Sequence, residues 1–219
     1  MQSLQKYFTD PLERRRLIMA VFGVLICAVG VALCRMAGFG VDSFQSFCSG
    51  VYNVSPLDEG TTYVIINVVL LVFALVTDRH YIGLGTLINL FLFGYVVDFS
   101  QQLMISLFGM PALAGRIVYL ALGFFVCCAA CSIYITADLG VSTYDAISLY
   151  LARVTPLHYR FIRIITDVIC VVIGWLLGSV PGICTILCAA LMGPMISWIN
   201  TWLSQPLLYG KKGKPADRA

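Results

Sequence analysis

Six polar residues lie in apolar parts of the chain and have the chemistry to bind a small solute or an ion. They are Asp145, Gln45, Asp167, Asn67, Thr86 and Thr185. Polar groups placed in lipid are costly, so each is a candidate for function. The carboxylates of Asp145 and Asp167 suit a cation or a proton, whereas the free N–H groups at the start of a short helix suit an anion.

Each candidate also has a purely structural interpretation. Asp167 follows Arg163 by four residues, so on a helix the two side chains share one face and can pair. Asp145 lies at the start of a short predicted helix, where a negative charge complements the helix dipole. Close packing between membrane helices is the structural explanation for Gly83, Gly85, Gly94, Gly182 and Gly193. Both interpretations stay open at the level of the sequence.

The nine cysteines do not indicate a metal or redox site. All lie in apolar segments without a histidine nearby in the sequence, although Cys128-Ala-Ala-Cys131 spells a CxxC motif. We interpret them as small packing residues. The sequence contains no HExxH or GxSxG motif and no convincing Cys/His pair, since His80 and His158 are placed in loops. We therefore expect no enzyme, no metal and no cofactor.

The composition excludes a soluble globular protein. Of 219 residues, 60% are hydrophobic and 11% are charged, and the mean hydropathy is +0.91, whereas soluble domains are roughly 45–50% apolar and about 25% charged. An uncharged stretch of 43 residues, Val168–Gly210, indicates a chain embedded in a lipid bilayer. The net charge is only +3, and no basic surface with interleaved aromatic residues indicates binding of nucleic acid.

Basic residues gather at the two ends of the chain. Lys6 and Arg14–Arg16 precede the first apolar run, and four more basic residues follow the last one within 211–218. By the positive-inside rule, such clusters keep both ends on the cytoplasmic side of the membrane. We therefore expect a cytoplasmic N-terminal segment at 1–15, retained rather than cleaved as a signal peptide, and a basic cytoplasmic tail at 205–219.

The apolar runs between charged residues predict an all-α integral membrane protein. Six runs have close to the ~20 residues that cross about 30 Å of hydrocarbon: Leu17–Cys34, Gly60–Thr77, Tyr81–Phe108, Ile117–Ala137, Phe161–Leu177 and Ile183–Leu203. Two shorter segments, Asp42–Asn53 and Ser142–Arg153, are too short to cross and are predicted to be re-entrant half-helices. Ser43 and Thr143 are their predicted N-caps.

The chain repeats itself at an interval of 100 residues. Between residues 16–72 and 116–172, 12 of 57 positions are identical. The matched positions include residue types that an apolar composition does not explain: Arg16 and Arg116, Gly23 and Gly123, Pro56 and Pro156, and, at an interval of 99, Thr86 and Thr185. We infer two membrane repeats of about 100 residues, at 16–108 and 116–204.

Each repeat holds three spans and one half-helix, and an odd number of crossings makes the second repeat enter from the opposite side. Such inverted repeats are typical of transporters whose site lies at the middle of the membrane. The charges agree, with twelve Lys or Arg inside and two, Arg35 and Arg116, outside. A parallel repeat with eight full spans has the same count, with Arg35 and Arg79 outside, so only the shortness of the half-helices favours inversion.

Three sequence blocks resemble a known family. Gly140-Val-Ser-Thr-Tyr-Asp145, Gly83-Leu-Gly-Thr-Leu-Ile-Asn89 and Gly94-x-x-x-Asp98 are similar to those of the YitT/YczE-like family of bacterial multi-pass membrane proteins. The resemblance extends over residues 16–203. This chain departs from the family pattern at Thr143, where proline is usual, and at Gln45, which replaces the acid in the first copy. The resemblance implies a bacterial plasma-membrane protein and implies no defined biochemical activity.

The predicted organisation favours a small-solute or ion transporter, or permease, with its site at the interface between the repeats. The alternative is a non-transporting membrane subunit that binds or regulates a partner protein, although the chain has no sizeable soluble domain. The lipid bilayer and an unknown small solute or ion are the expected partners, and homo-oligomerisation stays open.

Overall fold

The computed structural model describes residues 10–57, 59–77, 83–109 and 111–209. These residues form helices and no strands: α2 (Pro11–Ala37), α3 (Ser43–Val54), α4 (Glu59–Thr77), α5 (Leu84–Phe108), α6 (Leu113–Ala137), α7 (Thr143–Val154), α8 (Tyr159–Leu176), α9 (Ile183–Ile199), the π-helical turn η2 (Asn200–Ser204) and α10 (Gln205–Tyr209). The all-α class is thereby confirmed. The start of the predicted third span at Tyr81 and most of the predicted cytoplasmic segments 1–15 and 205–219 lie outside the described residues.

Within the described residues, three helical stretches are long and apolar enough to cross a membrane: Leu12–Ala37, Leu113–Ala137 and Ile183–Tyr209. α4 and α5 contribute the shorter apolar stretches Thr61–Thr77 and Leu92–Phe108. α8 has 18 residues, but its sequence includes Arg160, Arg163 and Asp167.

Many large apolar side chains point outward from this helical structure. Val76 on α4 is 81% exposed and Leu176 on α8 is 72% exposed. Extensive exposed apolar surface is unusual for a protein surrounded by water and is expected where the surface faces lipid.

The two short helices match the predicted half-helices to within a residue. α3 and α7 have 12 residues each, which corresponds to roughly 18 Å of length. The predicted N-caps, Ser43 and Thr143, are wrong by one position. Asp42 and Ser142 cap the helices instead, and each side chain accepts from the backbone N–H three residues later, at 3.0 and 3.1 Å. Their ψ angles of 167° and 153° are those of a cap, whereas Ser43 and Thr143 are already helical.

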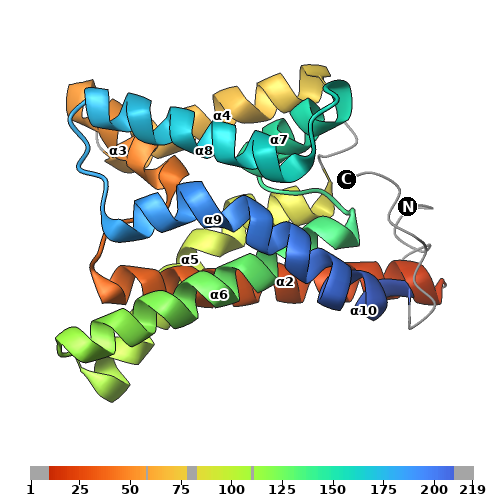
Figure 1. The fold of residues 1–219 in the computed structure, drawn as a ribbon, viewed down its shortest axis with the longest axis horizontal. Helices are drawn as coiled ribbons and strands as arrows, with labels where there is room; N and C mark the ends of the chain where they lie inside the picture. The colour runs from red at the N-terminus through yellow and green to blue at the C-terminus, as the bar shows by residue number, and fades with distance from the viewer. Residues whose placement is uncertain (1–9, 58, 78–82, 110, 210–219) are drawn as a thin grey trace.

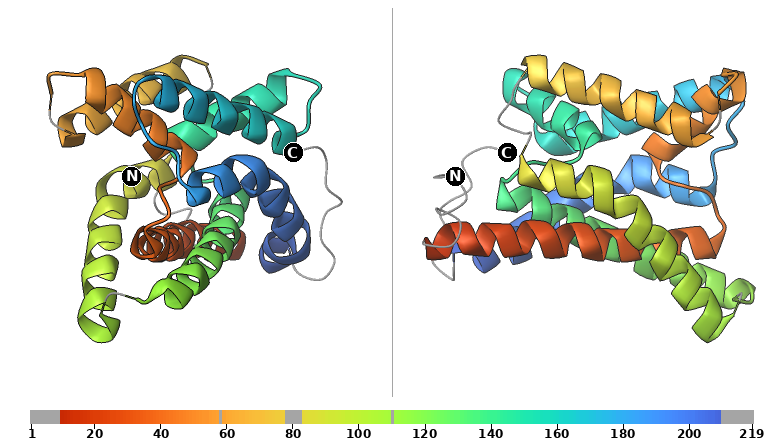
Figure 2. Two further views of the ribbon diagram at one scale, coloured as in Figure 1. Left: turned by 60° about the vertical axis from the view of Figure 1, so that its left-hand side comes forward. Right: turned by 180° about the vertical axis from the view of Figure 1, so that it is seen from behind.

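The helices form two layers (Figure 1). In one layer, α2 and α6 lie side by side and run in opposite directions, with α5 packed against α2 and α9 against α6 (Figures 1 and 2). The other layer holds α3, α4, α7 and α8, in which α3 packs against α8 and α7 against α4. Each short helix therefore packs against a long helix from the other half of the chain.

Two loops are held by contacts that recur at intervals of about 100 residues. The start of α5 binds the loop before α7, and the start of α9 binds the loop before α3. The hydrogen bonds correspond in pairs. Gly85 N–H donates to Leu139 O at 2.9 Å, and in the other half Cys184 N–H donates to Phe39 O at 3.0 Å. Thr86 Oγ1 donates to Val141 O at 2.8 Å, and in the other half Thr185 Oγ1 donates to Val41 O at 2.5 Å. These bonds fix where each short helix begins.

Glycines allow the loops to approach the starts of α5 and α9. Gly40 and Gly140 have φ angles of +104° and +98°, which other residues rarely adopt. A Cβ on Gly40 would lie 2.7 Å from Gly182 Cα, and one on Gly140 would lie 2.8 Å from Gly83 Cα. The predicted close packing between helices is confirmed for Gly193, where an added Cβ would lie 2.7 Å from the Arg160 carbonyl oxygen of α8, whereas Gly83, Gly85 and Gly182 are closely packed against loop backbone. At Gly94 the packing prediction is wrong, since an added Cβ would meet no atom of the described residues within 4 Å.

Candidate functional site

A cavity of about 130 Å³ lies at the N-terminal turns of the two short helices, and residues from both halves of the chain line it. Its wall includes four of the six sequence candidates: Gln45, Asn67, Asp145 and Asp167. The other two, Thr86 and Thr185, are not part of this wall and bind the loop carbonyls described above. The fold thus places the acidic and amide candidates around one space and uses the two threonines to position the short helices.

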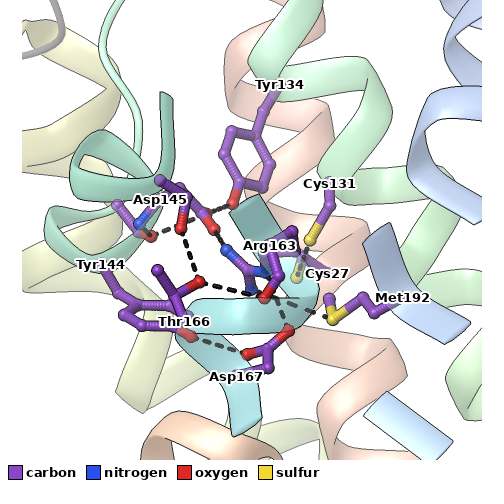
Figure 3. A network of polar contacts seen from close by, with 11 residues as sticks. Cys27, Cys131, Tyr134, Tyr144, Asp145, Arg163, Thr166, Asp167 and Met192 are labelled. Atoms are coloured by element: carbon purple, nitrogen blue, oxygen red, sulfur yellow. Dashed lines mark hydrogen bonds and ion pairs between the residues drawn. The ribbon is translucent and has the colours of Figure 1, made fainter. Parts of the chain in front are cut away.

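Arg163 on α8 is the charged centre of the cavity wall. Its guanidinium forms ion pairs with Asp145 on α7 and with Asp167 one turn further along α8, the latter with an Nε–Oδ2 distance of 3.2 Å (Figure 3). The three side chains are only 2–6% exposed. We call these three residues the triad. The predicted pairing of Asp167 with Arg163 is confirmed, and the second pairing, with Asp145, joins two helices.

Three hydroxyl groups surround the carboxylates of the triad. Tyr134 Oη donates to Asp145, as does Ser142 Oγ at 2.7 Å, and Tyr144 Oη donates to Asp167 at 2.7 Å (Figure 3). The Tyr144 ring also lies against the guanidinium, with its centroid 4.6 Å from Cζ. Buried charges are tolerated only when they are paired and hydrogen-bonded, and these three donors supply hydrogen bonds to both carboxylates of the triad. One guanidinium and two carboxylates give the triad a net charge of one negative charge.

α9 approaches the triad from another direction. Arg163 Nη2 lies 3.9 Å from Met192 Sδ on α9. Gly193, the next residue, permits this approach, since a Cβ there would lie 2.7 Å from the carbonyl oxygen of Arg160. The close α8–α9 packing therefore limits the positions that the guanidinium can take.

Asn67 on α4 anchors the first turn of α7. Thr143 Oγ1 donates to Asn67 Oδ1 at 2.8 Å, and Asn67 Nδ2 donates to the Tyr63 carbonyl at 3.0 Å. The residue that corresponds to Thr143 in the first half is Ser43. Its buried hydroxyl has no hydrogen-bond partner within the described part of the chain.

Sequence reasoning did not assign a role in the site to Asp42, Ser142, Tyr134 or Tyr144. A signal for the first two existed, because the 100-residue register aligns Asp42 with Ser142 at the start of each short helix. The tyrosines carried no comparable signal. Aromatic residues are common in membrane helices, and only the packing of α6, α7 and α8 directs these two hydroxyls to carboxylates.

The cysteines are packing residues, as predicted. All nine are free, and all are buried except Cys170, which is half-buried. Six of them line the cavity and make part of its wall apolar: Cys27, Cys34, Cys127, Cys131, Cys184 and Cys188. In the described ranges, no group of three or more His, Cys, Asp or Glu side chains is arranged to hold a metal ion.

Comparison with known proteins places this chain in a family. Residues 14–201 match the family described as a family of unknown function, DUF6198. The chain belongs to this family. It is similar to an uncharacterized membrane protein, YczE, of Bacillus subtilis (strain 168), with 26% identity over 180 residues that cover 81% of this chain and 78% of YczE.

A second relative of this DUF6198 chain is an uncharacterized protein of Haemophilus influenzae (strain ATCC 51907 / DSM 11121 / KW20 / Rd), with 23% identity over 179 residues that cover 81% of this chain and 80% of the relative. No solved structure matches the chain significantly. The resemblance to YczE-like bacterial membrane proteins is confirmed. Together with the apolar helices, it identifies a membrane protein.

Proposed function

We propose that this DUF6198 protein is a small-solute or ion transporter whose site is the cavity at the starts of α3 and α7. The observation that carries the proposal is the buried triad of Arg163, Asp145 and Asp167 in the cavity wall. Buried ion pairs contribute little net stability, because desolvation offsets their attraction. Charged groups inside a membrane protein instead tend to lie on pathways for solutes or protons.

We propose further that the two halves, 16–108 and 116–204, are inverted repeats. In support, α2 and α6 run in opposite directions, and the loop contacts recur at about 100 residues. The rings of Phe44 and Tyr144 stack with centroids 5.0 Å apart, and Cys127 Sγ lies 3.8 Å from the Cys27 carbonyl. Contacts between corresponding residues are expected at the twofold axis of an inverted repeat, which is where such transporters bind their solutes.

The lengths of the short helices support a re-entrant path. A helix of roughly 18 Å does not cross about 30 Å of hydrocarbon, so each half-helix leaves the membrane on the side from which its loop entered. This path implies six spans with both termini on the cytoplasmic side, in agreement with the basic residues at the two ends of the chain.

Transport is tested by reconstituting the purified protein in liposomes. Uptake of a panel of labelled cations, anions and neutral solutes is measured under proton, sodium and potassium gradients. Asp145→Asn converts the triad into a neutral Arg163–Asp167 pair, and we expect it to abolish uptake while the protein stays folded. Asp138→Asn is the matched control, because Asp138 is exposed at the end of α6 and its φ of 55° suits asparagine. Absence of uptake by folded wild-type protein under every gradient would contradict transport and favour the partner-binding alternative.

The membrane path is tested by sided cysteine labelling. Single cysteines replace Leu57, Leu113 or Leu157, which are 42%, 66% and 44% exposed, in a background without the native thiols. On intact cells, an impermeant maleimide should label positions 57 and 113, and position 157 only after permeabilisation. If none of the three is labelled on intact cells, the repeat is parallel with eight spans.

A further inference from the structure

The first turn of α3 contains a buried polar side chain that has no hydrogen-bond partner in the described part of the chain. Ser43 is 1% exposed and lines the cavity, and its hydroxyl forms no hydrogen bond with any residue that the structure describes. The corresponding hydroxyl of α7, that of Thr143, donates a hydrogen bond to Asn67. A buried polar group without a partner is costly, so a ligand in the cavity is the natural source of the missing hydrogen bond.

Asp42, the N-cap of α3, precedes Ser43 on the same wall. One of its oxygens accepts from a backbone N–H of α3 at 3.0 Å, and no cation among the described residues pairs with it. The two arginines that line the cavity are engaged elsewhere. Arg163 forms ion pairs within the triad, and Arg35 pairs with Asp98 at 3.0 Å. Asp42 is therefore a carboxylate in the cavity wall that forms no ion pair with any described residue.

The balance of charge distinguishes a cation from an anion. The triad carries one net negative charge and Asp42 carries another. The N-termini of α3 and α7 each contribute roughly +0.5 charge, which offsets about one of these two. Roughly one negative charge is left over in a cavity whose paired charged side chains are only 2–6% exposed, and this favours a monovalent cation.

The rest of the wall suits an organic cation better than a bare metal ion. Phe44 lies beside Tyr144 and Tyr63, with ring centroids 5.0 and 6.2 Å away, and cations bind to the faces of such rings. Six cysteine thiols also line the wall, and together with the aromatic rings they offer apolar contacts that the methyl group of an organic cation can use and a bare metal ion cannot. A volume of about 130 Å³ is close to the roughly 150 Å³ that admits benzene in an apolar cavity, so the ligand is small.

We infer that the cavity binds a small ammonium cation of about the size of methylammonium. Its N–H groups donate to the Asp42 carboxylate and the Ser43 hydroxyl, and its methyl group lies against the aromatic rings and the thiols. The inference rests on the proposed function, since it names the substrate class of the transport cavity, but binding is measurable without transport.

Binding is tested with radiolabelled methylammonium chloride at neutral pH, by scintillation proximity on the purified whole chain in detergent. We expect saturable binding that unlabelled dimethylammonium displaces and that equal concentrations of sodium or potassium chloride do not. Asp42→Asn should raise Kd at least about tenfold, because it removes a charge-assisted hydrogen bond. Asp138→Asn should leave Kd unchanged.

Ser43→Ala keeps the inference testable if Asp42→Asn does not fold. Since the Ser43 hydroxyl has no hydrogen-bond partner among the described residues, its removal should not lower the thermal unfolding temperature, yet it should weaken methylammonium binding severalfold. If Ser43 has only a structural role, Ser43→Ala leaves the Kd for methylammonium unchanged. That result would overturn the assignment of Ser43 as a ligand.

The outcomes separate this inference from the transport proposal. The ammonium class is overturned if folded wild-type protein shows no saturable binding of methylammonium, or if sodium or potassium displaces methylammonium equally well. This holds even if liposomes take up another solute. Saturable methylammonium binding that depends on Asp42, together with no uptake in liposomes, supports the site and overturns transport. Binding and uptake that are both lost in Asp42→Asn support the two proposals together.

Discussion

Replacing Arg163 with methionine is a direct test of the buried triad. Methionine retains much of the apolar length of the arginine side chain but removes the charge. Asp145 and Asp167, whose side chains are 5% and 2% exposed, are then left without a cation. Their hydroxyl donors remain, but hydrogen bonds from neutral groups do not replace an opposite charge in a site of low dielectric constant.

The size of the expected loss follows from the geometry. At an Nε–Oδ2 distance of 3.2 Å, the attraction between Arg163 and Asp167 is about 5 kcal/mol at an effective dielectric constant of about 20. Desolvation of the charges offsets much of this attraction in the intact pair. Removing one partner of a buried pair nevertheless costs about 3–5 kcal/mol, because the remaining charge stays buried. We expect Arg163→Met to lower the free energy of unfolding by about 3–5 kcal/mol.

The assay is reversible unfolding of the purified protein in mixed micelles of a mild detergent and SDS. Arg160→Met is the control on the same helix. Arg160 is exposed and its Cζ lies 4.8 Å from the centre of the Phe161 ring, so its loss should cost at most about 1 kcal/mol.

Adding Asp145→Asn and Asp167→Asn to the Arg163→Met variant should restore most of the lost stability, because no unpaired charge is left. The reasoning is refuted if Arg163→Met costs less than about 1 kcal/mol, or if the triple variant is no more stable than the single one.

Four further variants test the packing and hydrogen bonds in the same unfolding assay. Gly50→Ala places a Cβ 2.6 Å from a backbone oxygen of α8 and should cost about 1–3 kcal/mol, whereas Gly94→Ala, with no atom within 4 Å, should stabilise α5 by up to about 1 kcal/mol. Equal stability of these two variants would contradict the close α3–α8 contact. Thr185→Val removes the bond to the loop before α3 and should cost about 1–3 kcal/mol; an unchanged unfolding free energy would mean that the loop is held by other contacts. Tyr134→Phe removes a donor to a triad carboxylate and should cost about 1.5–3 kcal/mol, and a smaller loss than about 0.5 kcal/mol would argue against this hydrogen bond.

Local structure was predictable where it depends on neighbouring residues. The glycine in front and the Pro-Leu pair behind each short segment predicted α3 and α7 to within a residue. The N-caps were misplaced because two capping side chains stand next to each other at both helix starts, Asp42 before Ser43 and Ser142 before Thr143. Which of the two caps depends on where the backbone turns, and contacts with α9 and α5 set that point.

The site was predictable in part. Of the six polar candidates in apolar segments, Gln45, Asn67, Asp145 and Asp167 line the cavity. The other two are threonines, whose hydroxyls donate to loop carbonyls. A side chain that binds the backbone of a distant loop has the same sequence signature as one that faces a cavity, because both are polar groups surrounded by apolar neighbours.

The class of protein, its family and the position of each short helix follow from the sequence alone, since hydropathy, helix capping and glycine placement act over a few residues. The pairing of Asp167 with Arg163 was also within its reach, because the two lie one helical turn apart. The contact of Arg163 with Asp145, 18 residues away on another helix, depends on the tertiary structure, as does the lack of a hydrogen-bond partner for Ser43 among the described residues. Such contacts depend on how helices from opposite halves of the chain pack together, and the residues adjacent in sequence do not specify that packing.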